Sequence, residues 1–344
     1  MPLKYELFDA IAEQGRLEEF FHFALCMRNE RRWSLYNSAL AFTQNDGCAH
    51  ILTRSGWEKI HRYIKPGARP IVILRRYAAV TYVYDLADTE GEPLPESIRF
   101  IQDYIEPEPQ PIADYVFPYL KKICHELGIL YEERPMGTLA GGSARKLKFP
   151  QTFYVSRRKS EKKPGKKWEI TYPQVALNVW HAITINSNCN TTVKTFNLLH
   201  EMGHILCGHL PLESKEKKGE YLHLPLRDFN EREDGTLIDN GQNSTGYLDR
   251  FDDPLVQQME WEAEKVCQVT CRILGFKYDP SEYLRSYGAI GDKDAAPGSL
   301  QVVLMAADKI VNLMEKIDED KEREQREALK EKTRQLQNAQ EREY

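Results

Sequence analysis

The sequence has no apolar run approaching the roughly 18 residues that a membrane span needs. Its first residues include acidic and polar side chains where a secretory signal peptide requires a continuous apolar stretch. The seven cysteines are odd in number, widely scattered and without a Cys-x-x-Cys pair. These absences argue against a membrane protein and against a disulfide framework. They predict a cytoplasmic protein with free thiols.

An overall positive charge is also lacking, since 47 Lys and Arg stand against 52 Asp and Glu, a formal net charge of -5. This balance argues against a uniformly basic nucleic-acid binder, but it leaves room for local patches. Residues 54–76 hold seven Lys or Arg and one Glu, a local net charge of +6. Residues 145–167 hold ten Lys or Arg and one Glu, a local net charge of +9. Each patch is either a nucleic-acid contact or a solvated basic surface.

The length of 344 residues indicates about two domains, and 41% hydrophobic with 29% charged residues is typical of globular proteins. Between Glu106 and Pro111 proline alternates with polar residues, which predicts an extended linker. We therefore expect an α+β protein with a small N-terminal α+β domain over 1–105, a linker over 106–113, a second domain over 114–300 and a charged helical tail over 301–344.

Hydrophobic periodicity and turn residues predict the main elements. In the first domain we expect helices over 7–29 and 33–44 and strands at 49–52, 71–74 and 80–84. In the second we expect a helix over 113–128, a loop over 137–143, a strand at 182–185, a helix over 191–210, an irregular polar excursion over 211–250, and a helix over 254–274 that ends at Gly275.

The strongest motif is the His-Glu-x-x-His pattern of His200, Glu201 and His204. Positions i and i+4 share one face of a helix, so both imidazoles can reach one metal ion. Glu201 then lies beside the open metal position, where it can take a proton from water whose pKa zinc lowers to about 7. This pattern predicts a zinc-dependent peptidase site, with zinc chosen on ligand type. A chance pattern on a buried helix is the alternative.

The surroundings agree with such a helix. Asn190 or Thr191 can cap its start, and the strand at Ile183–Ile185 is a candidate edge on which an extended peptide could pair. A near-copy of the motif begins at His125, but Ile129 stands where the second histidine would be, so it cannot chelate.

A third ligand is needed, because hydrolytic zinc sites have three protein ligands and a water. Leu210 stands where a metzincin would have its third histidine, which excludes that class. His209, five residues past His204, is expected to face away from the ligand pair. We predict Glu260 as the ligand and Glu264, one turn later, as a partner that orients a ligand histidine. Glu262 is turned about 200° from Glu260 on the same helix.

Several other residues have open roles. A merely charged helix face is the alternative for Glu260 and Glu264. Cys267 and Cys271, four apart on the same helix, suit either a metal or buried packing, and we favour packing. Tyr221, Tyr247 and Tyr283 are all candidates to stabilise the oxyanion, without a basis for choosing among them.

The first basic patch is interleaved with aromatic residues, and this combination suits single-stranded nucleic acid, because basic groups neutralise phosphates and aromatic rings stack on unpaired bases. Solvated basic groups beside core aromatics are the alternative. The residues of and beside this patch expected to contact DNA are Trp33, Tyr36, Trp57, Lys65, Arg69, Arg75 and Arg76.

Two stretches resemble known families. Tyr36-Asn37, Gln44, Trp57, the stretch 64–71, Tyr84-Asp85, Thr89 and Gly91 resemble the single-stranded-DNA-binding domain of ArdC-like antirestriction proteins. The motif at 200–204 with Glu260, Ala263 and Glu264 resembles ImmA/IrrE-type metallopeptidases with a zincin-like fold. The resemblance implies single-stranded DNA as a partner, with Asn37 as a further DNA contact, Zn²⁺ as the cofactor, Glu260 as the third ligand, and an origin in a bacterial mobile element or phage.

Three functions therefore stay open. The first is a DNA-associated zinc endopeptidase whose protein substrate the sequence does not name. The second is a non-proteolytic protein that protects single-stranded DNA, with a metal that only holds helices together. The third is a repressor-cleaving peptidase whose N-terminal domain binds protein.

Overall fold

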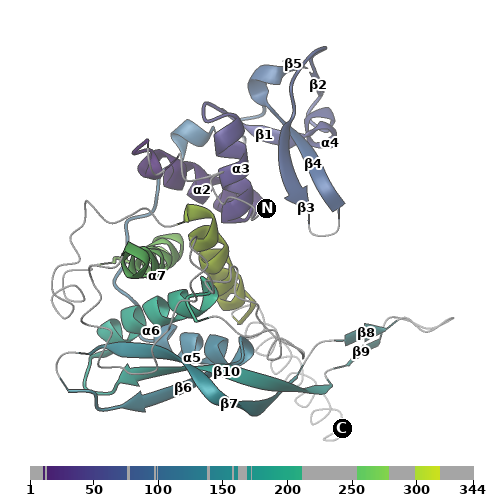
Figure 1. Ribbon diagram of the computed structural model, residues 1–344. Coiled ribbons are helices and arrows are strands. Elements are labelled where there is room, and N and C mark those ends of the chain that lie inside the picture. The colour runs from purple at the N-terminus through teal and green to yellow at the C-terminus, as the bar shows by residue number, and fades with distance from the viewer. Residues whose placement is uncertain are drawn as a thin grey trace, which may run out of the picture.

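The computed structural model describes residues 11, 14–75, 78–96, 98, 100–137, 140–156, 159–161, 169–171, 173–210, 254–278 and 299–317. Within these ranges the chain is an α+β protein, as the sequence predicts (Figure 1). The expected excursion over 211–250 and the three candidate tyrosines Tyr221, Tyr247 and Tyr283 lie outside the described residues, as does the chain beyond residue 317.

The N-terminal unit packs α3 against a small antiparallel sheet with the strand order β1-β4-β3, and α2 packs on α3. A short ribbon of β2 and β5 extends from it (Figure 1). The elements are α2 (Leu17–Arg31), α3 (Leu35–Gln44), β1 (Ile51–Thr53), α4 (Arg54–Glu58), β2 (Arg62–Ile64), β3 (Ile71–Arg75), β4 (Ala78–Asp85), η1 (Leu86–Asp88), β5 (Thr89–Gly91) and η2 (Ile101–Asp103).

Side chains of α3 close the free edge of this sheet. The Asn37 amide donates to the carbonyl of Leu74 at 3.0 Å and accepts from its N–H at 2.9 Å. Seven residues later, Gln44 makes the same pair of hydrogen bonds with the backbone of Val72, at 2.8 and 2.9 Å. Alternate residues of an edge strand point their backbone groups outward, so the two amides satisfy groups that another chain could otherwise pair with.

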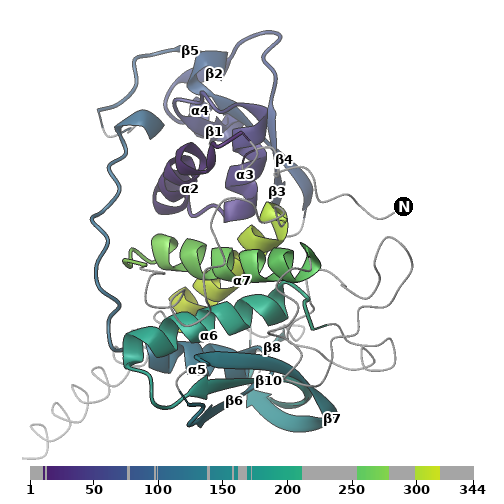
Figure 2. The same cartoon turned by 60° about the vertical axis from the view of Figure 1, so that its left-hand side comes forward.

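The second unit is layered, with a three-stranded sheet, then α5 and α6, then α7 (Figure 2). Strand β10 lies between β6, which is parallel to it, and β7, which is antiparallel. The elements are α5 (Val116–Glu126), β6 (Ile129–Arg134), β7 (Gly142–Ser156), β8 (Lys159–Glu161), β9 (Glu169–Thr171), β10 (Gln174–Asn186), α6 (Thr191–Leu206), α7 (Pro254–Ile273) and a helix over 300–317.

The position of β10 corrects one expectation. Ile183 and Ile185 were predicted to lie on an edge strand, but both are fully buried in the central strand of the sheet. Ile183 is opposite Ala144 of β7 and Tyr131 of β6, so neither side of β10 is free for a peptide there. The edge of this sheet that adjoins α6 belongs to β7.

The helix over 300–317 changes the expectation that the second domain ends at residue 300 and a charged tail begins at 301. It contributes to the core rather than to a solvated tail, because its apolar side chains are buried: Leu300, Val302, Val303, Leu304, Ala306, Ala307, Ile310, Val311 and Met314. Most of them belong to one contiguous apolar cluster that also includes residues of α2, α3, α6 and α7. The two predicted domains therefore share a core.

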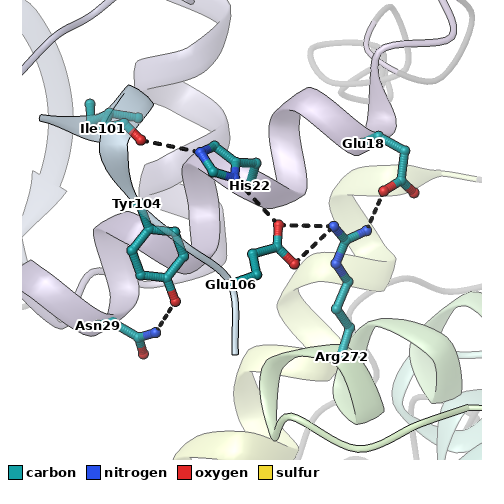
Figure 3. Close-up of polar contacts among 7 residues, drawn as sticks. All are labelled: Glu18, His22, Asn29, Ile101, Tyr104, Glu106 and Arg272. Carbon is teal, nitrogen blue, oxygen red and sulfur yellow. Dashed lines mark hydrogen bonds and ion pairs between the residues drawn. The ribbon is translucent and has the colours of Figure 1, made fainter. Parts of the chain in front are cut away.

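Polar contacts join the same two units. Arg272, near the end of α7, lies between Glu18 of α2, at 2.8 Å, and Glu106 of the predicted linker, at 3.1 and 3.2 Å (Figure 3). The linker carries neither helix nor strand except at Gln110, which forms an isolated bridge with Phe276. The end of α7 is thus fixed against the N-terminal unit. None of the helices in the described ranges combines the length and apolar composition needed to cross a bilayer.

Candidate metal centre

Helix α6 holds the His-Glu-x-x-His motif in the interior of the second unit. The side chain of Asn190 caps its start by accepting a hydrogen bond from the N–H of Val193 at 2.9 Å, as the sequence predicts. Every residue from Thr195 to Leu206 is buried. The helix therefore lies between the sheet and α7, and its motif faces other protein elements more than solvent.

Three donor groups converge from α6 and α7. The Nε2 atoms of His200 and His204 are 3.0 Å apart, and they lie 3.2 and 3.5 Å from the two carboxylate oxygens of Glu260. Donor atoms bound to one tetrahedral zinc ion at about 2.0–2.1 Å would be about 3.3 Å apart, which matches this spacing. The exposed fractions of the three residues are 3, 7 and 6%. Two imidazoles and a carboxylate in this geometry fit a divalent cation.

The close crossing of α6 and α7 brings Glu260 to the two histidines. Gly203 of α6 lies against the backbone of Ala263 of α7, so the helix axes approach more closely than two larger residues would allow. Ala263 is three residues after Glu260, almost one helical turn, and it is fully buried. Small residues at the crossing therefore place the carboxylate within reach of the imidazoles.

The electrostatics of the three groups are strongly coupled. Burial alone would lower the pKa of His200, but hydrogen bonds to Glu260 and Glu264 outweigh it and raise that pKa to about 10. Burial would raise the pKa of Glu260, but the two histidines outweigh it and hold that pKa well below its usual value. Without a cation, the site thus keeps a negative carboxylate beside a positive imidazole. A divalent cation replaces the bound proton.

Glu201 lies beside the donors without joining them. Its carboxyl group is buried, which raises its pKa, although His204 and His200 oppose that effect. It accepts a hydrogen bond from the backbone of Ala144 in β7. A Cβ added to Gly142 would lie 3.2 Å from Glu201 Cγ and 3.3 Å from its Oε1, so a glycine there leaves room for the carboxyl group.

Glu264 has the contact predicted for it. Its Oε2 is 3.4 Å from Nδ1 of His200, on the side of the ring opposite the other donors. Its second oxygen accepts a hydrogen bond from the hydroxyl of Tyr278. Cys267 and Cys271 are buried in the apolar core, and neither joins a metal-capable group among the residues that the structure describes. Packing is therefore their role.

Sequence reasoning missed a second buried group formed by Cys207, His209 and Glu262. His209 does not face away from the ligands, because α6 ends at Leu206 and Gly208, with φ of +84°, turns the chain back. Its Nδ1 is 2.8 Å from Nδ1 of His204. Glu262 does lie on another face of α7 than Glu260, but that face is fully buried. The sequence signal that could have revealed this group is Glu262, a glutamate on a helix face that otherwise carries mainly apolar residues.

The candidate DNA-binding residues separate into three kinds. Trp57 is fully buried, and its Nε1 donates to the carbonyl of Tyr84 at 3.0 Å, so the expectation that it stacks on bases is wrong. Asn37 holds the edge of β3, and Tyr36 packs partly buried against the core. Lys65 is exposed, and its Nζ donates to Ala87 at 2.8 Å.

The remaining candidates are surface groups or undescribed side chains. Arg69 is exposed, whereas the side chain of Arg75 and all of Arg76 lie outside the described residues. Two other residues of the ArdC-like resemblance, Asp85 and Gly91, stabilise the local backbone. Asp85 accepts hydrogen bonds from the N–H groups of Ala49, His50 and Ala87. Gly91, with φ of +135°, has no room for a Cβ, since one would lie 2.3 Å from the His61 carbonyl oxygen.

A cleft of about 1690 Å³ opens between the N-terminal sheet, α2 and the helix over 300–317. It is lined by Trp33 and Asn37 of the predicted set and by Arg32 and Arg54, which the prediction did not include. Arg28 also lines the cleft but is buried and paired with Asp308 and Glu315. Tyr82 also lines it and is 54% exposed. The residues of the candidate metal centre do not line this cleft, so the cleft and the metal centre lie apart in the described structure.

Comparisons of the chain with protein-family models, curated proteins and solved structures give no match.

Proposed function

We propose that this chain is a zinc-dependent endopeptidase, as its resemblance to ImmA/IrrE-type metallopeptidases implies. The observation that carries the proposal is the meeting of His200, His204 and Glu260 at distances of 3.0–3.5 Å, with the buried Glu201 beside them. Zinc held by this donor set supplies Lewis acidity, which lowers the pKa of a water molecule to about 7.

The number of donors favours catalysis over a purely structural metal. Structural zinc sites are closed by four protein ligands, whereas hydrolytic sites have three and keep one position open. The group at His200, His204 and Glu260 has three members among the described residues. Glu201 sits next to it with a raised pKa, which suits a group that takes a proton from the attacking water and returns it to the leaving amine.

Strand β7 is the proposed place for the substrate backbone. It is the edge strand beside α6, and its residues Gly142 and Ala144 contact Glu201. An extended peptide can add to such an edge through backbone hydrogen bonds. Asn197, one turn before Glu201, is buried, and its amide has no hydrogen-bond partner in the described structure. A Cβ added at Gly141, just before β7, would lie 2.4 Å from Asn197 Nδ2, so this amide packs beneath the start of the edge strand.

The experiment that tests this function compares Glu201→Gln with wild type in cleavage of fluorescence-quenched casein, after loading with zinc. Removal of a general base lowers the rate by about 10²- to 10⁴-fold, while zinc binding persists because all three donors are retained. The matched control is Glu126→Gln, in the near-copy of the motif on α5, and it should cleave at the wild-type rate. Cleavage by Glu201→Gln at the wild-type rate would contradict the proposal.

We further propose that the N-terminal unit binds single-stranded DNA in its cleft, as the ArdC-like resemblance implies. Arg32 and Arg54, which are exposed, can neutralise phosphates, and Trp33 and Tyr82 can stack on bases. The proposed partner is thus single-stranded DNA in the bacterial cytoplasm, in the setting of a mobile element or phage.

Full DNA protection by Glu201→Gln would instead favour the non-proteolytic protein. Failure to bind oligonucleotides would favour the repressor-cleaving peptidase.

A further inference from the structure

The second buried group lies directly behind one of the metal-ligating histidines. After α6 ends, the N–H of His209 bonds to the carbonyl of His204 at 3.0 Å, which places the two rings 5.0 Å apart. His209 is 2% exposed, and Glu262 is fully buried. A carboxylate and two imidazoles thus form a row that runs from α7 to the metal-ligating side of α6.

The hydrogen bonds in this row have one consistent direction when a metal is bound. Nε2 of His204 faces the other donors, so its Nδ1 carries the hydrogen and donates to Nδ1 of His209, 2.8 Å away. His209 then carries its own hydrogen on Nε2 and donates to Glu262 Oε2 at 2.9 Å. Each donor in this row has an acceptor, the arrangement that makes a buried polar network stabilising.

The row ends just before the helix over 300–317. Glu262 Oε1 accepts a hydrogen bond from the backbone N–H of Ser299 at 2.7 Å. This contact fixes the carboxylate between α7 and the residue that precedes the helix over 300–317. At the other end of the turn, His181 of β10 contacts the Leu210 carbonyl at 2.8 Å and fixes the segment that carries His209.

The same three residues could instead hold a second metal ion, since Cys207, His209 and Glu262 offer donors within 4.8 Å of one another. Both nitrogens of His209, however, already lie at hydrogen-bond distance from His204 and Glu262. One oxygen of Glu262 is likewise taken by Ser299. A second ion would have to break these contacts in a fully buried place, so the geometry favours the hydrogen-bonded row.

We propose that His209 and Glu262 are positioning residues, which fix the tautomer and ring orientation of His204 and so set the zinc affinity of the site. This inference rests on the proposed zinc site and adds a second layer to it. The two ligand histidines are then held differently: Glu264 contacts His200 directly, whereas Glu262 acts on His204 through an intervening imidazole.

The first test measures zinc affinity by competition with a chelating dye for wild type, Glu262→Gln, His209→Phe and Cys207→Ala. Loss of partners that orient a ligand typically costs about 10- to 100-fold in metal affinity, which we expect for His209→Phe. Glu262→Gln should lose less than His209→Phe, because its single amide oxygen can still accept from His209, although its NH2 group then faces the N–H of Ser299. Cys207→Ala, beside the row but outside it, should bind one zinc with wild-type affinity.

The second test reports on the site itself rather than on stability. The cobalt-substituted His209→Phe protein should show altered d–d absorption bands, because the ring of His204 is no longer held, while the bands of Cys207→Ala stay unchanged. In zinc-loaded wild type, nitrogen NMR should show hydrogen on Nδ1 of His204 and on Nε2 of His209. This measurement needs no variant and therefore decides the matter even if a variant fails to fold.

Several results would overturn the inference. Unchanged affinity and cobalt spectrum in His209→Phe, or hydrogen on Nδ1 of His209 in the zinc-loaded protein, would remove the positioning role while leaving the peptidase proposal intact. Two zinc ions in wild type, with one lost in Cys207→Ala, would assign a second metal site instead. A wild-type chain that binds no zinc would refute the proposed function along with the row.

Discussion

Gly203 of α6 and Ala263 of α7 touch backbone to backbone where the two helices of the candidate metal centre cross. A Cβ added at Gly203 would lie 2.9 Å from the Cα of Ala263 and 3.0 Å from its carbonyl oxygen, and neither atom can move without shifting α7. The position of Glu260 relative to the two histidines therefore depends on residue 203 being glycine, which has no side chain to hold the helices apart.

Gly203→Ala should separate the helices and weaken zinc binding. Alanine ordinarily favours a helix over glycine by about 1 kcal/mol, but overpacking a core typically costs about 1–3 kcal/mol, so we expect net destabilisation. Chemical denaturation and zinc titration would measure both effects. Gly47→Ala is the control, since its added Cβ would meet only Asn45 Oδ1 at 3.8 Å. A Gly203→Ala protein as stable as wild type, with unchanged zinc affinity, would contradict this account of the crossing.

Zinc binding should release a proton. The pKa of His200 is raised to about 10 in the metal-free site, so its imidazole is charged at neutral pH and must lose its proton to bind a cation. Between the ordinary pKa of 6.5 and about 10, the apparent zinc affinity should rise at least tenfold per pH unit. Calorimetry at pH 7.5 in two buffers of different ionisation enthalpy should show release of at least one proton, that of His200, with a further contribution from zinc-bound water whose pKa is about 7, and a buffer-independent heat would refute the expectation.

The same pKa shift predicts how the metal-free protein responds to pH. The folded-state pKa of His200 lies above its unfolded value, so its contribution to stability is fully present below pH 6.5 and is lost as the pH rises through about 10. Denaturation of the metal-free protein at pH 6.5 and 9.5 should therefore show a decline that His200→Gln diminishes. An equal decline in that variant would place the pH dependence elsewhere.

Tyr82 should contribute to DNA binding, whereas the equally exposed Tyr63 should not. Tyr82 is exposed in the cleft, so Tyr82→Ala should weaken binding of a fluorescein-labelled oligo(dT) about fivefold or more, the loss expected for one stacked base. Tyr63 is equally exposed, at 56%, but it does not line the cleft, so Tyr63→Ala should bind normally. Fluorescence anisotropy measures both, and equal affinities for Tyr82→Ala and wild type would argue against the cleft.

Trp57→Phe is expected to lower stability and leave DNA affinity unchanged. The indole is fully buried and hydrogen-bonded to Tyr84, so its loss leaves a cavity and an unpaired carbonyl, at a cost of about 1–3 kcal/mol. Denaturation and anisotropy on the same sample separate the two effects. Weaker DNA binding by a fully folded Trp57→Phe protein would restore the stacking role that its burial contradicts.

Features set by neighbouring residues were predictable from the sequence. The spacing of His200 and His204 implies a shared helix face, Asn190 caps α6 as expected, and α7 ends at Ile273, two residues before Gly275 with its φ of +72°. The choice of Glu260 and Glu264 also follows from helical periodicity, once a third ligand is required. In each case the evidence lies within one helix.

Features set by distant packing were not predictable in the same way. His209 reaches His204 only because the helix stops at Leu206, and periodicity cannot locate that stop. The burial of Glu262 depends on contact with Ser299, 37 residues later. Trp57 lies in a basic segment and looks like a surface aromatic residue, yet its ring is fully buried and its Nε1 donates to the carbonyl of Tyr84. Long-range pairing with β7 likewise makes β10 central.

Metal analysis of the purified chain tests the central claim most directly. Elemental analysis of wild type beside His204→Ala and Glu260→Ala should find about one zinc per chain in wild type and almost none in either variant, because each removes one of three converging donors. Wild type without zinc, or a Glu260→Ala protein that retains it with undiminished affinity, would contradict the assignment of this site.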